Sequence, residues 1–122
     1  MLTILKKSER SLKSNEMIRM FKQLGYSIKN LGEYDKWKDL SDGGRLQVKI
    51  TVYKITDTEG KIFYMMVDTL GRIMNQFTQD KNEVFDWLKE KGYKPEKQWY
   101  LEDYGMSEET WNAWNGKEQE EE

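Results

Sequence analysis

The feature that most constrains the fold is an alternation of apolar and polar residues in the middle of the chain. Residues 46–52 place Leu, Val, Ile and Val at every second position, which is the period of a strand buried on one face. Two further apolar runs, 62–67 and 72–77, follow after the turn residues 58–60 and 70–71. These three runs predict an antiparallel meander.

Other strand signals extend this prediction toward the N-terminus. The turn 42–44, Asp-Gly-Gly, joins the strand at residue 46 to a less regular strand over 34–40, and 26–31 suits a further edge strand. Ile55 breaks the parity of the alternation, so we expect a bulge or a twist near Lys54.

Two stretches with a helical period, 14–26 and 80–93, flank the strands. Each begins with a residue type favoured at the helix N-cap, Ser14 and Asp80, and each ends at a Gly-Tyr pair. Glycine supplies the left-handed conformation that ends many helices, and the tyrosine can fold back over the last turn. The order of elements predicts an α+β fold, in which an antiparallel meander of three to five strands packs against an N-terminal and a C-terminal helix on one sheet face.

Charge divides the chain into two regions. Residues 1–98 carry 19 basic and 14 acidic side chains, a net charge of +5, whereas 99–122 carry one basic and eight acidic side chains, a net charge of −7. We therefore expect a basic α+β body over 1–98 and an acidic, aromatic C-terminal segment over 99–122. Within this segment Ser107 caps a short extra helix ending at Gly116, and the closing run of glutamates predicts a disordered tail.

The absence of histidine and cysteine argues against catalysis. It removes the commonest general base near neutral pH, the commonest transition-metal ligand, thiolate nucleophiles and disulfides. We therefore expect no enzymatic activity, no cofactor and no metal site. One pattern, 59–61 (Glu-Gly-Lys) with Asp42 or Asp57 upstream, resembles the signature of Mg²⁺-dependent nucleases. It falls in a turn rather than on a strand, so the nuclease hypothesis ranks last.

The chain carries no signal for a membrane. No run approaches about 18 consecutive apolar residues, and the N-terminal apolar residues precede the lysines rather than follow them. We expect a cytoplasmic protein, in the cytoplasm of the host cell if a phage encodes it.

The acidic, aromatic segment is the predicted partner-binding site. Aromatic side chains would anchor it, and carboxylates would engage a basic groove on a protein partner. By analogy with accessory proteins of phages and mobile elements, anti-CRISPR proteins among them, such a nucleic-acid mimic would inhibit a nuclease or a nucleic-acid-binding complex. The residues assigned to this role are Glu102, Asp103, Tyr104, Glu108, Glu109, Trp111 and Trp114. Two alternatives stay open: the same aromatics pack a third helix onto the body, or they join two copies in a homodimer.

Direct nucleic-acid binding by the basic body is the alternative function. Its predicted phosphate contacts are Lys6, Lys7, Arg10 and Lys13. Further basic candidates are Lys49, Lys54, Lys61 and Arg72, with Tyr34, Trp37 or Tyr53 available for stacking on bases. Affinity that falls steeply with salt would mark this function.

Overall fold

The computed structural model describes residues 2–114, apart from the side chains of Glu96 and Asp103. Its elements follow in the order η1 (Lys7–Glu9), α1 (Ser14–Gln23), β1 (Ser27–Asp39), β2 (Arg45–Thr56), β3 (Ile62–Val67), α2 (Lys81–Glu90), β4 (Lys94–Pro95), α3 (Glu96–Gln98), η2 (Trp99–Asp103) and α4 (Glu108–Trp114). The fold is α+β, with an antiparallel sheet, a helix on either side of it in sequence and a short extra helix near the C-terminus, as the patterns predict.

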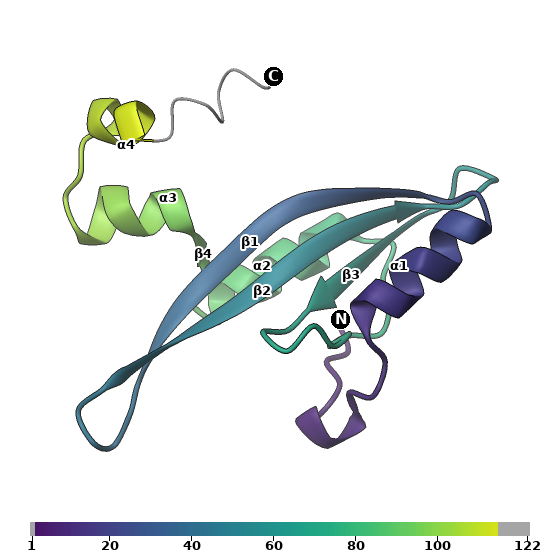
Figure 1. Cartoon of the computed structure of the whole chain (residues 1–122), viewed down its shortest axis with the longest axis horizontal. Coiled ribbons are helices and arrows are strands. Elements are labelled where there is room, and N and C mark those ends of the chain that lie inside the picture. Colours follow the sequence, from purple (N-terminus) through teal and green to yellow (C-terminus); the bar gives the residue numbers. More distant parts are fainter. Residues whose placement is uncertain (1, 115–122) are drawn as a thin grey trace.

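A long hairpin dominates the sheet, whose strand order is β3-β2-β1-β4. The two strand signals expected over 26–31 and 34–40 form one continuous strand, β1, which pairs with β2 along its whole length. β3 pairs only with residues 51–56 of β2, and β4 pairs only with Tyr34 and Asp35. The far half of the hairpin therefore extends as a two-stranded ribbon beyond the helices (Figure 1).

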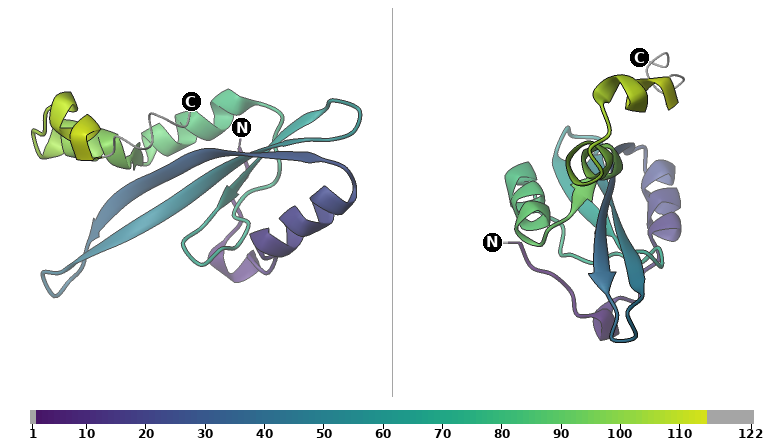
Figure 2. Two further views of the ribbon diagram at one scale, coloured as in Figure 1. Left: turned by 45° about the horizontal axis from the view of Figure 1, so that its top comes forward. Right: turned by 90° about the vertical axis from the view of Figure 1, so that its left-hand side faces the viewer.

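The helices cover opposite faces of the sheet, so the prediction that they share one face is wrong. Helix α2 contributes Val84 and Leu88 to a core with Val52 and Met66 on one face. Helix α1 contributes Phe21 to a second core on the other face, together with Ile55, Met65, Val67 and Ile73. The right-hand view of Figure 2 shows the strands between the two helices.

The irregularity expected near Lys54 is present, but the extra residue lies in the partner strand. The β1–β2 register shifts between the pairs Asn30–Tyr53 and Gly32–Val52, whereas the β2–β3 register runs unbroken past Lys54. At the register shift, Asn30 Oδ1 accepts a hydrogen bond from the Gly32 amide at 2.7 Å. Ile55 breaks the alternation for another reason, because it points toward α1 and is fully buried there.

Residues 72–77 run beside β3 without forming the regular strand that their pattern predicts. Isolated bridges join Val67 to Ile73 and Tyr64 to Thr78. Between them the Asn75 side chain replaces the backbone ladder, because its Oδ1 accepts the Met66 amide at 2.8 Å. The other edge of this segment pairs with the N-terminal residues through bridges Ile4–Asn75 and Lys13–Arg72.

The helix ends follow the predicted Gly-Tyr geometry. Gly25 and Gly92 both have positive φ, and the amides of Tyr26 and Tyr93 donate back to Phe21 and Leu88. Each tyrosine ring stacks on an aromatic ring of its own helix, Phe21 in α1 and Trp87 in α2. At the helix starts, Asp80 caps α2 through the Asn82 amide. Ser14 is the first residue of α1 rather than its cap, a position that Lys13 occupies without a side-chain hydrogen bond.

Within residues 2–114, none of the helices is long and apolar enough to span a membrane.

Replacing Asn75 by Ala should destabilise the fold. Asn75 is 2 % exposed, and its loss would leave the buried Met66 amide without an acceptor. An orphaned buried polar group costs about 1–3 kcal/mol, so the midpoint of urea unfolding should fall accordingly. The control is Gln76→Ala, which changes the exposed neighbour of Asn75 and should leave the midpoint nearly unchanged. Equal midpoints for the two variants would contradict the role given to Asn75.

Candidate functional site

Two surfaces are candidates for binding a partner. The first is the C-terminal arm, defined here as residues 94–114, which contains β4, α3, η2 and α4. It lies against β1 at the start and reaches away from the sheet toward α4 (Figure 1). The second is a basic groove between the hairpin and the N-terminal residues.

A single tryptophan anchors the arm to the sheet. The indole Nε1 of Trp99 donates a 2.9 Å hydrogen bond to the backbone oxygen of Asp35, a buried residue of β1. Lys94 Nζ lies 4.6 Å from the centre of the Trp99 ring, in the geometry of a cation–π contact. Because β4 also pairs with Tyr34 and Asp35, this end of the arm is held by the backbone ladder as well as by a side chain.

The outer helix α4 packs on η2 through aromatic rings. The Tyr100 ring centre lies 5.5 Å from that of Trp111 and 5.4 Å from that of Tyr104. Ser107 Oγ accepts the Thr110 amide at 3.1 Å, which confirms the predicted cap. The expected helix end at Gly116 and the expected disordered tail lie outside the described residues. Some aromatic side chains of this region, such as Tyr100 and Trp111, pack within the arm, whereas Trp114 is exposed.

Two of the predicted site acids already have partners within the arm. Glu102 forms an ion pair with Lys94 at 3.2 Å and accepts a hydrogen bond from Gln98. Glu108 forms an ion pair with Lys97 at 2.8 Å. These contacts lower the pKa of both carboxyls. For Glu102 the hydrogen bond from Gln98 has the largest effect on the pKa, followed by the hydrogen bond from Lys94. Both carboxylates therefore share their charge with a lysine of the arm.

The remaining predicted site residues differ in how far they are exposed to solvent. Trp114 is 69 % exposed and Tyr104 is 56 % exposed. Glu109 is also exposed, on the same helix as Trp114. Trp111 is half-buried against Tyr100 and belongs to the packing of the arm. The Asp103 side chain lies outside the described residues. Trp114 and Glu109 are thus both exposed on one helix, α4.

The second surface is a groove of about 580 Å³ beside the distal part of the hairpin. Its floor includes apolar side chains of β2 and the aromatic pair Trp87 and Tyr93 at the end of α2. Burial raises the pKa of Tyr93, and the nearby charge of Arg10 partly offsets that increase. The basic residues that line the groove are Lys7, Arg10, Lys36, Lys38, Lys49 and Arg72, against one acid, Asp68.

The basic residues assigned from sequence do not form one patch. Lys7 and Arg10 line the groove, whereas Lys6 and Lys13 are absent from its lining. Sequence reasoning missed Lys36 and Lys38. Their spacing of two on β1 is the available signal, since alternate residues of a strand share a face.

The residues of the nuclease hypothesis are not gathered into one site. Asp42 lies in the turn at one end of β2, whereas Asp57 and Glu59 follow its other end. Twelve residues of strand separate the two turns by roughly 40 Å. Asp57 Oδ1 accepts the amides of Glu59 and Lys61, so it closes the hairpin turn. Among residues 2–114, no three acidic side chains converge as a metal site would need.

Replacing Trp99 by Phe should loosen the arm while the body stays folded. The change keeps an aromatic ring at this position but removes the N–H that donates to the Asp35 oxygen. The lost hydrogen bond should reduce the stability of the attachment by about 1 kcal/mol. Hydrogen exchange of amides in 96–103 should accelerate about fivefold, with core amides of β2 and β3 unaffected. Trp114→Phe is the matched control and should change neither set. Unchanged exchange in Trp99→Phe would remove the indole from the anchoring role.

The carboxyl of Glu108 should titrate below an ordinary glutamate, because Lys97 stabilises its charged form. Its ion pair therefore contributes stability above the usual glutamate pKa, and this contribution disappears as pH falls through the lowered pKa. Replacing Lys97 by Met should raise the pKa of Glu108 in an NMR titration. Replacing Lys94 by Met should leave Glu108 unchanged and raise the pKa of Glu102. The reverse pattern would contradict the pairing.

Comparisons with known proteins assign no family to this chain. No protein-family model matches it. Neither a curated protein nor a solved structure matches it.

Proposed function

We propose that this chain is a non-catalytic binding protein that occupies a protein partner stoichiometrically, with the C-terminal arm as the docking surface. The observation that carries the proposal is the exposure of Trp114 and Tyr104 on a segment that other side chains attach to the sheet. Trp99 and β4 hold the arm to the sheet, and Tyr100 with Trp111 holds α4 to η2. The two exposed rings are thus left available for contact.

The chemistry of the arm favours a partner with a basic surface. Large aromatic side chains dominate binding energy at many interfaces, and surrounding carboxylates steer a positively charged partner. Glu109 supplies such a charge on the same helix as Trp114, while Glu102 and Glu108 share theirs with Lys94 and Lys97. A nuclease or nucleic-acid-binding complex presents a groove of the required charge. Inhibition of such a complex, in the manner of an anti-CRISPR protein, is the role that we propose for the arm.

The docking role is tested best by the most exposed aromatic side chains of the arm. In a pull-down from a nuclease-treated lysate of the source cells, the wild-type chain should retain a protein in equimolar amount. The double substitution of Tyr104 and Trp114 by Ala should lose that protein, because it removes both exposed rings. A variant at Trp111 is less suitable, since its ring is half-buried against Tyr100, whereas Tyr104 is exposed although it also contacts that ring.

The matched control is Leu24→Ala, which removes an exposed apolar side chain at the end of α1. It should retain the partner as well as the wild type does. Equal retention by the double variant and the control would refute the arm as docking surface. A change from dimer to monomer in the double variant, measured by light scattering, would replace the foreign partner with a second copy of the chain.

A further inference from the structure

The basic groove has an unbalanced charge that the fold itself does not require. Its lining holds six basic residues and one acid, and they come from four separate parts of the chain. Lys7 and Arg10 belong to the N-terminal residues, Lys36 and Lys38 to β1, Lys49 to β2 and Arg72 to the segment after β3. Like charges repel one another, so their collection around one concavity favours an anion.

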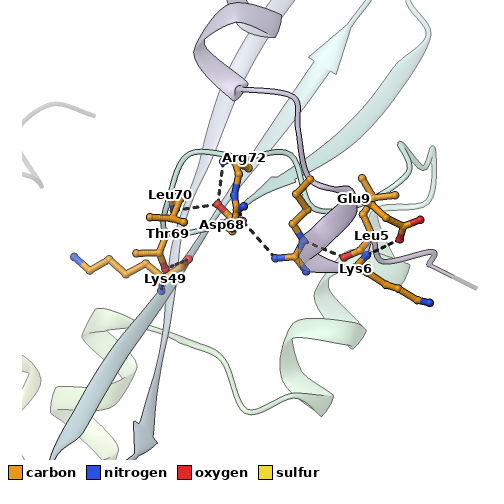
Figure 3. A network of polar contacts seen from close by, with 9 residues as sticks. Leu5, Lys6, Glu9, Lys49, Asp68, Thr69, Leu70 and Arg72 are labelled. Atoms are coloured by element: carbon orange, nitrogen blue, oxygen red, sulfur yellow. Dashed lines mark hydrogen bonds and ion pairs between the residues drawn. The ribbon is translucent and has the colours of Figure 1, made fainter.

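At the inner end of the groove, two guanidinium groups share one carboxylate oxygen. Arg10 Nη1 lies 3.4 Å and Arg72 Nε lies 3.3 Å from Asp68 Oδ2. The other oxygen, Oδ1, accepts the amides of Leu70 and Arg72 and closes the turn between β3 and the next segment. Figure 3 shows Asp68 between that turn and the Arg72 side chain. One positive charge therefore remains uncompensated.

Burial increases the effect of that remaining charge. The side chains of Arg10 and Asp68 are 10 % and 11 % exposed. Arg72 Nε is buried and forms no hydrogen bond, although it makes the ion-pair contact with Asp68. Water screens charges less at a buried site than at an open surface. The attraction between this charge and an anion is therefore stronger at this end of the groove.

The outer part of the groove has a row of lysines on the hairpin. Lys36 and Lys38 are two residues apart on β1, opposite Val48 and Leu46 of β2, so all four side chains share one face. Successive positions on that face are about 6.6 Å apart. Lys36 Nζ lies 5.1 Å from the centre of the Tyr93 ring. Figure 3 shows that the Lys49 side chain points away from Asp68, so Lys49 is left out of the proposed contacts.

The floor of the groove is apolar and partly aromatic. The rings of Trp87 and Tyr93 are stacked with centres 5.9 Å apart. Leu46 and Leu70 belong to the same apolar lining and are 51 % and 67 % exposed. Flat, weakly polar ligand groups fit such a floor, and negatively charged groups fit the cations beside it. A linear polymer that alternates planar bases with phosphates has both features.

We infer that the groove binds single-stranded nucleic acid, with Arg10, Arg72, Lys36 and Lys38 facing phosphates and the apolar floor facing bases. A basic groove lined with aromatic side chains is the general form of single-strand binding sites. Bases in a duplex are stacked and paired, so they are not free to contact the floor. The inference concerns residues outside the C-terminal arm and stands independently of the arm's docking role.

The first test is the fluorescence anisotropy of a labelled oligothymidylate of about 12 nucleotides, titrated with the full chain. Replacing Lys36 and Lys38 by Gln should weaken binding at least about tenfold at about 50 mM salt. The slope of log affinity against log salt should become shallower by about 1.4, because two phosphate contacts are lost. The matched control replaces the exposed Lys22 and Lys29, which do not line the groove, by Gln. This control should change neither quantity substantially.

The second test separates base contacts from charge. Replacing Leu46 and Leu70 by Ala should weaken binding and leave the salt slope unchanged, since no cation is removed. Absent binding by the wild type, or equal losses in the Lys36/Lys38 variant and its control, would overturn the proposal. So would displacement of the oligonucleotide by polyglutamate or by duplex DNA at concentrations as low as those of the unlabelled single strand. The former result would assign the groove to an acidic peptide and the latter to double-stranded DNA.

Discussion

Burial of both faces of β2 and β3 is the constraint on which the rest of the structure depends. Adjacent residues of β3, Met65 and Met66, are fully buried on opposite faces, one under α1 and the other under α2. A strand can be apolar at successive positions only where each face has a cover. The two helices must therefore lie on opposite sides of the sheet. The N-terminal residues reach across to pair with the segment after β3, which completes the outer edge.

The length of that cover decides where the basic groove lies. β3 has six residues, whereas β1 and β2 have 13 and 12, so the sheet is only two strands wide over the far half of the hairpin. Apolar residues such as Leu46 remain exposed there, beside the lysines of the same face. The turn held by Asp68 and the N-terminal cations then border this uncovered stretch. The groove is thus a consequence of unequal strand lengths.

The C-terminal arm follows a different logic, in which polar and aromatic contacts replace a core. Among the described residues, none of α4 is buried, and its attachment comes from the Tyr100–Trp111 contact and the Lys97–Glu108 ion pair. Exposed ion pairs contribute little stability, so the indole of Trp99 carries more of the attachment than the charges do. The sequence did not reveal that Trp99 packs against the sheet whereas Trp114 is exposed.

Features that depend on neighbouring residues could be predicted from the sequence, whereas contacts between distant residues could not. The Gly-Tyr helix ends, the Asp80 and Ser107 caps and the strand period of 46–52 depend on neighbours within a few residues, so the α+β class follows from them. The groove joins Arg10 to a partner 58 residues away, and Trp99 meets a partner 64 residues away. No periodic pattern encodes such pairs. Which face each helix covers, which acids are neutralised and which cations converge are decided only when the two layers of core close around the sheet.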